Sequence, residues 1–334
     1  MGYDQNVLRR ATARLEENHR LHGEQTQQRR RQAYARQPRL SQLDRALRGT
    51  MAELIGTALG RGEDTTATVQ DIRERNLALQ RERSDLLAQM GLKSEDLDDT
   101  PLCAQCNDSG WRGTVMCQCL KELCAQEQIK ELSKLLNLGE QSFDTFRIDY
   151  YSQSIYPGTG VSPRENMELV YEVCLNYAQK FGRFYFKNLY LSGPPGLGKT
   201  FLSACIARTV SENGFSVVYD TAGNIFAQFE ARKFQRDIQD AREAKDDTRR
   251  YLNCDLLIVD DLGSELTTQF IQTALYELVN TRMVSGKHTV ISSNLSMEEA
   301  ARRYSPQIAS RLAGEYHVLR FFGDDIRLLK KNQI

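Results

Sequence analysis

One eight-residue stretch limits the fold of this chain more than any other feature. It reads Gly193-Pro194-Pro195-Gly196-Leu197-Gly198-Lys199-Thr200 and comes just after the apolar run Leu189-Tyr190-Leu191. The apolar run predicts a buried strand, and the glycine-rich loop fits the pattern GxxxxGK(S/T) of a P-loop that opens a helix. Backbone N–H groups and the positive end of the helix dipole bind phosphates in such a loop. We therefore expect Lys199 to reach the β- and γ-phosphates of ATP and the Thr200 hydroxyl to bind Mg²⁺.

A second apolar run ends in two acidic residues. The sequence Leu256-Leu257-Ile258-Val259-Asp260-Asp261 is typical of a buried parallel strand that carries a Walker B acid pair. We expect Asp260 to hold Mg²⁺, directly or through water, and Asp261 to orient or deprotonate the attacking water. Many ATPases of this type have Glu at the second position. The shorter Asp261 therefore leaves the rate of hydrolysis open, although it does not affect the expectation of nucleotide binding.

Three polar residues downstream of the acid pair are candidates for contact with the nucleotide. Asn294 follows the predicted strand 289–292 and would act there as sensor 1 on the γ-phosphate, unless it is an ordinary turn residue. Arg311 is the candidate arginine finger, which stabilises the charge on the transferred phosphoryl group in a neighbouring subunit. Arg327 is the candidate sensor 2 of the same subunit. A solvated surface charge is the alternative for either arginine.

The cysteines are unevenly distributed. The chain has eight, and four of them lie within 17 residues: Cys103, Cys106, Cys117 and Cys119. Two short-spaced thiolate pairs can close a tetrahedral Zn²⁺ site, which with four sulfurs would be structural and not catalytic. The alternatives are a redox-active CxxC pair, free thiols, or Cys124 in place of Cys119.

The first hundred residues differ in composition from the rest of the chain. The whole chain is neutral, with 44 basic and 44 acidic side chains. Residues 1–50, however, carry 11 arginines against 5 acids, and residues 51–100 carry 6 basic against 11 acidic side chains. Only two aromatic residues, Tyr3 and Tyr34, lie there, too few for an ordinary globular core. This composition predicts a helical segment that binds a protein partner.

The helical pattern of this segment varies in quality. In residues 1–60 it is weak and is interrupted by Pro38 and by glycines 49, 56 and 60, with Gly62 directly after them. In residues 65–90 the apolar residues fall on a/d positions of one heptad frame: Val69, Ile72, Leu79, Leu86 and Met90. Gly91 is placed to end that helix. Packing as a hairpin or against a partner would bury the stripe, and a solvated helix without a partner is the alternative.

The sequence contains no signal for membrane insertion. No stretch approaches the roughly 18 consecutive apolar residues of a membrane span, and the first residues lack the apolar core of a signal peptide. We therefore expect a cytoplasmic protein without a membrane partner.

The motifs after the P-loop also resemble those of a known family. Residues 259–265 (VDDLGSE), 292–296 (SSNLS), 310–312 (SRL) and 323–327 (GDDIR) are similar to the AAA+ ATPases of the DnaC/DnaI/IstB group, over about residues 143–330. The cysteine segment, with Asn-Asp-Ser-Gly between its pairs, looks like the zinc-binding segment of DnaC/DnaI-like helicase loaders. That segment is less expected in the shorter IstB transposition proteins.

This resemblance implies an α/β fold. It predicts an AAA+ P-loop NTPase domain with a parallel sheet at 141–334, preceded by a helical N-terminal arm at 1–95. Between them, residues 96–140 would form a small zinc-binding module and a linker helix. The expected cofactors are ATP, Mg²⁺ and Zn²⁺.

The resemblance also implies a function and partners. We expect an ATP-dependent loader of the hexameric replicative DNA helicase onto single-stranded DNA, acting at replication initiation or restart. The arm would bind the helicase, and the ATP-bound AAA+ domains would bind DNA and associate into a spiral or ring. The alternatives are an IstB-like ATPase that acts with a transposase on duplex DNA, and a non-catalytic adaptor with a degenerate nucleotide site.

The residues that would contact DNA are less defined. The basic candidates lie in one charged stretch: Lys233, Arg236, Arg242, Arg249 and Arg250. Acidic residues alternate with them, which is equally typical of a solvated helix face. Phe234 is the one aromatic residue close by, and a strand-binding groove often includes such a stacking side chain.

Overall fold

The computed structural model describes residues 3–59, 65–136, 141–234 and 248–331. Within these ranges, no helix has both the length and the apolar character needed to cross a membrane. The chain divides into two compact units, Ala13–Cys117 and a second unit formed by Met1–Thr12 with Gln118–Ile334.

The second unit is built on a five-stranded parallel sheet with the strand order β4-β5-β6-β3-β7. Its strands are β3 (Asn188–Ser192), β4 (Val217–Thr221), β5 (Leu256–Leu262), β6 (His288–Ser293) and β7 (Tyr316–Arg320). The P-loop strand β3 lies between β6 and β7. Because the strands are parallel, the P-loop, the acid pair near the end of β5 and the turn after β6 all meet at one edge.

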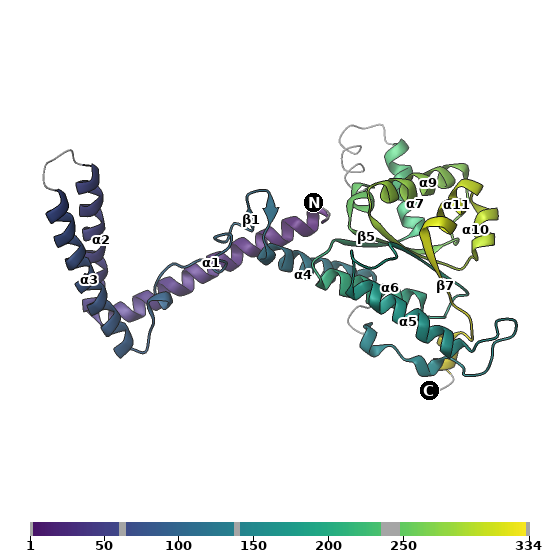
Figure 1. Cartoon of the computed structure of the whole chain (residues 1–334), viewed down its shortest axis with the longest axis horizontal. Coiled ribbons are helices and arrows are strands. Elements are labelled where there is room, and N and C mark those ends of the chain that lie inside the picture. Colours follow the sequence, from purple (N-terminus) through teal and green to yellow (C-terminus); the bar gives the residue numbers. More distant parts are fainter. Residues whose placement is uncertain (1–2, 60–64, 137–140, 235–247, 332–334) are drawn as a thin grey trace. The chain divides into compact units, whose positions relative to one another are not determined.

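Helices cover both faces of this sheet (Figure 1). They are α4 (Gln118–Leu135), α5 (Pro163–Gln179), α6 (Lys199–Glu212), α7 (Ala222–Phe234), α9 (Gln269–Val284), α10 (Met297–Arg303), α11 (Pro306–Glu315) and α12 (Ile326–Lys331), with the 3₁₀ turns η2 (Phe143–Thr145) and η3 (Ile148–Tyr150). Leu189 and Leu191 of β3 pack with α5 and α6, whereas Tyr190 packs with α7 and α9 on the other face. This alternation is the period of a strand that is buried on both faces. The expected α/β fold with a parallel sheet after N-terminal helices is confirmed.

A capping box fixes the start of α5. Ser162 caps α5 by accepting a hydrogen bond from the Glu165 N–H at 3.2 Å, and the Glu165 carboxylate accepts one from the Ser162 N–H at 2.9 Å. This reciprocal capping box satisfies two donors that the first helical turn leaves open. β7 and α10 were not predicted from the sequence, because each is short and neither has a long apolar run.

A buried glutamine attaches α4 to the sheet domain. The Gln128 amide donates hydrogen bonds to the Ser211 hydroxyl (2.6 Å) and the Phe215 carbonyl (3.0 Å). Its carbonyl accepts one from the Val217 N–H at 2.9 Å. One side chain thereby satisfies backbone groups at the α6–β4 turn and at the start of β4.

The unit Ala13–Cys117 is largely helical. It contains most of α1 (Gln5–Arg36), with α2 (Pro38–Leu59), α3 (Thr65–Gln89), η1 (Ser94–Asp96) and the hairpin strands β1 (Trp111–Arg112) and β2 (Val115–Met116). A small core forms from Ala33, Leu40, Leu87 and Leu97. The Arg83 guanidinium, on the heptad face of α3, forms ion pairs with Asp44 (2.7 Å) and Asp98 (2.9 Å).

The helix predicted at 65–90 is confirmed, and so is its stop. Gly91 has a φ of +68°, and the Leu92 N–H donates to the Leu87 carbonyl at 2.9 Å, as in a Schellman motif. The expected interruptions at Gly49 and Gly56 are wrong, because α2 continues through both. Pro38 is the first residue of α2, where a helix tolerates proline because that N–H has no intrahelical acceptor.

Candidate nucleotide site and cysteine cluster

A cavity of about 560 Å³ lies at the carboxyl edge of the sheet. The P-loop, the ends of β4, β5 and β6, the segment before α5 and the start of α12 all contribute to its walls. The predicted residues that line it are Pro195, Gly196, Gly198, Lys199, Thr200, Asp260, Asp261, Asn294 and Arg327. Residues that lie far apart in the sequence therefore meet around one cavity.

The P-loop packs so closely against the end of the chain that two of its positions require glycine. Gly193 has a φ of +151°, and a Cβ there would lie 2.1 Å from the Phe321 carbonyl oxygen. Gly196 has a φ of +80°, and a Cβ there would lie 2.0 Å from Oδ1 of Asp325. The Ile326 N–H also donates to the Gly196 carbonyl at 3.1 Å. The shape of the loop thus depends on the segment that leads into α12.

The Lys199 ammonium lies within the curve of its own loop. It donates hydrogen bonds to the carbonyls of Gly193 (2.5 Å) and Pro194 (2.7 Å). Burial lowers the pKa of Lys199, while the carboxylates of Asp260 and Asp261 oppose this shift. A buried ammonium of this kind gains from an anionic partner.

Hydroxyl groups from neighbouring elements surround the Asp260 carboxylate. Its Oδ2 accepts hydrogen bonds from the Thr200 hydroxyl (3.1 Å) and the Tyr219 phenol (2.5 Å), and its Oδ1 accepts one from Ser292. Carboxylate and hydroxyl oxygens are the protein ligands that Mg²⁺ accepts, and Asp260 and Thr200 present both to the same cavity. The contacts of Tyr219 and Ser292 with Asp260 were not predicted from the sequence, because they depend on the strand order, which puts β4 and β6 on either side of β5.

The remaining nucleotide candidates divide into two groups. Asp261, Asn294 and Arg327 line the cavity. Asp261 has a φ of +57°, an uncommon conformation for a residue with a side chain. Arg311 does not line the described part of the cavity; its guanidinium lies over the Tyr276 ring, 5.2 Å from the centroid, on the outer surface of α11 and α9.

The segment before α5 forms a wall of the cavity. Several of its residues line the cavity: Gln141, Thr145, Phe146, Arg147, Tyr150 and Tyr151. The Tyr151 hydroxyl donates to the Leu197 carbonyl of the P-loop at 2.9 Å, and the Phe146 and Tyr151 rings stack at 5.9 Å. The aromatic residues of the segment were the sequence feature from which this packing against the P-loop could have been predicted.

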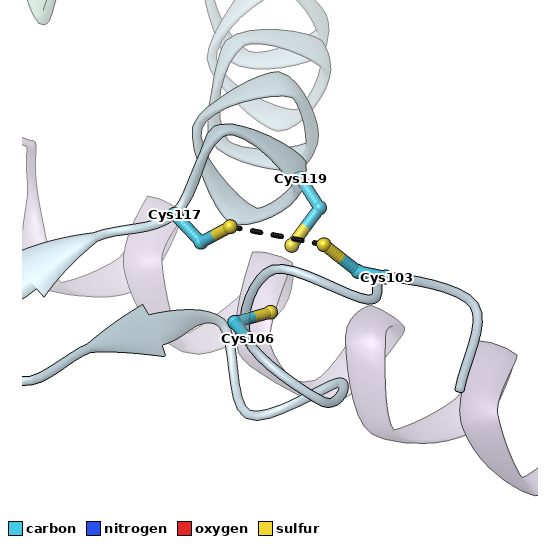
Figure 2. A group of neighbouring side chains, drawn as sticks. All are labelled: Cys103, Cys106, Cys117 and Cys119. Carbon is cyan, nitrogen blue, oxygen red and sulfur yellow. Dashed lines mark hydrogen bonds between the residues drawn. The ribbon is translucent and has the colours of Figure 1, made fainter. Parts of the chain in front are cut away.

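The four clustered cysteines point toward one another (Figure 2). Their sulfur atoms all lie within 4.8 Å of one another, and those of Cys103 and Cys117 are 3.8 Å apart. A tetrahedral zinc site with Zn–S bonds of about 2.3 Å needs sulfur atoms roughly 3.8 Å apart. The arrangement fits Zn²⁺, with Cys103 and Cys106 on one loop, and Cys117 and Cys119 around the start of α4.

Asp108 shapes the first of the two cysteine loops. Its carboxylate accepts hydrogen bonds from the N–H groups of Cys103 (2.7 Å) and Leu102 (3.0 Å), and His19 lies at 2.9 Å. Burial acts to raise the pKa of Asp108, but these contacts outweigh it and lower the pKa. Cys124 does not belong to the cluster among the described residues, so its proposed substitution for Cys119 receives no support.

The basic stretch considered for DNA contact is only partly described. Arg236 and Arg242 lie outside the described residues. Lys233 lies over the Phe270 ring, 5.1 Å from its centroid. The Arg250 guanidinium donates hydrogen bonds within the chain, to the Tyr251 hydroxyl at 2.7 Å and to the Asp220 carboxylate at 3.4 Å.

The C-terminal part of the chain is similar to known proteins. Residues 184–334 match the model of the IstB-like ATP binding protein family. The chain is 26% identical over 125 residues to the uncharacterized protein YdaV of Escherichia coli K12, covering 37% of this chain and 48% of YdaV. It is 24% identical over 200 residues to the chromosomal replication initiator protein DnaA of Caldanaerobacter subterraneus, covering 59% of this chain and 39% of DnaA. It thus spans less than half the length of these relatives.

A solved structure titled as the DnaC helicase loader is similar to this chain, with 16% identity and a TM-score of 0.44. The similar region covers 56% of this chain and 99% of the chain in that structure. Within the matched region, residues of the P-loop, the acid pair, Asn294 and Arg327 line one cavity, whereas Arg311 does not line its described part. Residues 184–334 therefore belong to the IstB-like ATP-binding family, in the DnaC/IstB group of AAA+ proteins related to replication initiation proteins.

Proposed function

We propose that this protein is an ATP-dependent loader that places the hexameric replicative DNA helicase on single-stranded DNA. One observation carries the proposal: the chain combines an IstB-like ATP-binding region with a four-cysteine cluster and a helical segment before it. The DnaC/DnaI-like loaders, which the sequence motifs resemble, combine the same three parts. The replication role named for the DnaA relatives is consistent with it.

ATP would bind in the cavity at the carboxyl edge of the sheet. Lys199 would exchange its carbonyl partners for phosphate oxygens, and Thr200 and Asp260 would hold Mg²⁺, which would neutralise phosphate charge. Asp261 would orient the attacking water, with Asn294 and Arg327 near the γ-phosphate. This arrangement supports ATP hydrolysis as well as binding.

The parts of the chain would divide the work. Residues 1–95 would bind the helicase, and residues 96–140, held by Zn²⁺, would connect them to the ATPase at 141–334. The ATPase would bind single-stranded DNA and associate with further copies in a spiral or ring. Arg311, whose guanidinium lies over the Tyr276 ring outside the described cavity of its own chain, would complete the site of a neighbouring copy.

Retention of a purified replicative helicase by the immobilised full-length protein tests the proposal. We expect the helicase to be retained when ATP is present. Charge reversal on the first helices should reduce this retention while ATP binding persists. Retention of duplex DNA and a transposase, without the helicase, would instead assign the IstB-like function. Failure to bind ATP, with Lys199→Ala as the reference variant, would assign a non-catalytic adaptor.

A further inference from the structure

A group of aromatic rings lies at the edge of the sheet opposite the nucleotide cavity. Phe184, Tyr185 and Phe186 follow α5 and lead into the amino end of β3, whereas the P-loop leaves its carboxyl end. The centroid of the Tyr185 ring is 4.3 Å from that of Phe184 and 4.2 Å from that of Phe186. Tyr185 is nevertheless 74% exposed. A large ring is thus held against two others while most of its surface faces water.

The two neighbouring rings are fixed by the core. The Phe186 ring stacks on His317 of β7, with centroids 3.7 Å apart and planes 10° apart. Phe184 meets the buried Tyr177 ring edge-on at 6.0 Å. The Tyr177 hydroxyl also donates to the Lys187 carbonyl at 3.0 Å, which fixes the backbone beyond the rings. These four residues, Phe184, Tyr185, Phe186 and His317, form what we call the aromatic step.

Positive charge surrounds the aromatic step. Lys180, Arg183 and Lys187 lie within eight residues, and no acidic residue occurs between Val173 and Ser211. The side chains of Arg183 and Lys187 form no ion pair or hydrogen bond with any described residue, and Lys180 bonds only to Asn176, at 3.0 Å.

Few carboxylates face these cations. Asp255, at the same edge of the sheet, is neutralised by Lys287 at 2.8 Å. Glu315 directly precedes β7, and Glu212, the last residue of α6, is paired with Arg208 at 3.0 Å. The net charge around the aromatic step therefore remains positive.

We propose that the aromatic step binds single-stranded nucleic acid, stacking an unpaired base on Tyr185 while Arg183 and Lys187 bind the flanking phosphates. An exposed, rigid ring flanked by cations is what a single strand needs, because every base has a face for stacking. A duplex offers no free base face. The inference rests on the proposed function in taking a single strand as ligand, but it assigns the contact to the aromatic step instead of the charged stretch that the sequence suggested.

Binding of labelled homopolymers to the full-length protein tests the step. We would measure fluorescence anisotropy with thymine and uracil strands of about 20 nucleotides, long enough to cover one such site. We expect Tyr185→Ala to weaken binding about five- to hundredfold, the range lost when a stacked base loses its aromatic partner. Tyr185→Phe keeps the ring and should bind as the unaltered protein does.

A matched control is available on the same unit. Tyr156 is 38% exposed and packs on the Phe322 ring at 5.2 Å, away from the step. Tyr156→Ala should therefore leave strand affinity unchanged. ATP affinity reports folding of the Tyr185 variants, and we expect it to be unaltered because the cavity lies at the other edge of the sheet.

Salt dependence tests the cations separately. Each phosphate contact to a single strand contributes about 0.7 to the slope of log affinity against log salt. Arg183→Glu and Lys187→Glu should each reduce that slope by about this amount, whereas Lys134→Glu, an exposed lysine on α4, should not. An unchanged slope in both step variants would overturn the phosphate assignment.

The other outcomes separate this inference from the proposed function. Equal strand binding by the unaltered protein and Tyr185→Ala would overturn the step while leaving the loader proposal in place. Loss of helicase retention in Tyr185→Ala without loss of strand binding would make the step a protein-docking surface and refute our assignment. Failure of the unaltered protein to bind either strand would overturn both the step and the single-strand part of the loader proposal. Preference for the thymine or the uracil strand identifies DNA or RNA as the ligand, and either supports the step.

Discussion

At the scale of single residues, the Asp260 carboxylate shows how the fold prepares a metal ligand. It is buried, and a buried carboxylate is costly unless hydrogen bonds replace its lost hydration. Thr200, Tyr219 and Ser292 supply those bonds from three different elements. Burial, followed by the negative charge of Asp260, raises the pKa of Tyr219, so its phenol keeps the proton that it donates.

Removal of the Tyr219 hydroxyl should therefore affect magnesium more than nucleotide. In Tyr219→Phe we expect a several-fold higher Mg²⁺ concentration for half-maximal ATP hydrolysis, nearly unchanged ATP affinity, and a loss of about 1 kcal/mol in unfolding free energy. A magnesium titration of the ATPase rate measures the first effect. Tyr251→Phe removes a similar buried Tyr–Asp hydrogen bond, to Asp220, and should lower stability without changing the magnesium requirement. An equal magnesium shift in both variants would contradict a positioning role for Tyr219.

At the scale of elements, helix α4 illustrates how one polar side chain attaches a helix to a sheet. The three hydrogen bonds of Gln128 join α4 to the α6–β4 turn and to the first residue of β4. Apolar contacts from Leu132 add to them in the core. Because hydrogen bonds are directional, Gln128 sets the position of α4 along the sheet as well as contributing to its stability.

Gln128→Ala should leave the Phe215 carbonyl and the Val217 N–H buried without partners. We expect it to reduce the unfolding free energy by about 1–3 kcal/mol, measured by urea denaturation, because unsatisfied buried groups retain their desolvation cost. Gln118→Ala, at an exposed position of the same helix, should change stability by less than about 0.5 kcal/mol. Equal effects of the two substitutions would contradict the role given to Gln128.

The cysteine cluster makes a second prediction at this scale. The purified protein should contain one zinc per chain, and Cys103→Ser with Cys106→Ser should abolish it, because two thiolates cannot close the tetrahedron. Elemental analysis measures the content. Cys124→Ala should retain the zinc, since Cys124 is a buried thiol outside the cluster whose pKa is raised to about 11 by burial. Zinc that persists in the double variant would refute the four-cysteine site.

At the scale of the whole molecule, the surface position of Arg311 makes its proposed catalytic role depend on a second copy. Arg311 lies outside the described cavity of its own chain, while Arg327 lines it. A guanidinium supplied by a neighbour stabilises the transferring phosphoryl group, so hydrolysis would require assembly. ATP binding itself needs only the residues of one chain.

Arg311→Ala should therefore bind ATP normally but hydrolyse it roughly 10³-fold more slowly in the assembled state. Mixing it with Lys199→Ala should restore part of the activity, because the Lys199 variant offers Arg311 to the intact P-loop of its neighbour. Arg302→Ala, an exposed arginine of α10, serves as the control and should keep full activity. Absence of any restoration across mixing ratios would remove the support for action in trans.

The sequence was sufficient for those parts of the fold and site that rest on local patterns. The P-loop, the acid pair and the helix stop at Gly91 each follow from neighbouring residues, and the structure places all of them as expected. Tyr219, Ser292 and the wall at 141–151 were missed because only the strand order and the packing of distant segments bring them to Asp260 and the P-loop. The glycines of α2 led to a wrong prediction of helix breaks, because the surrounding helix outweighs the low helix propensity of each glycine.

The walls of the cavity have a practical consequence for handling this protein. Gln141 and Arg327 both line it, so the shortest fragment with a complete pocket has to extend at least between those two residues. Arg147, near the beginning of that fragment, and Arg327, near its end, are both sites at which trypsin can cut. A molecule occupying the pocket would shield both bonds together, and the digestion pattern would then report its occupancy without any label.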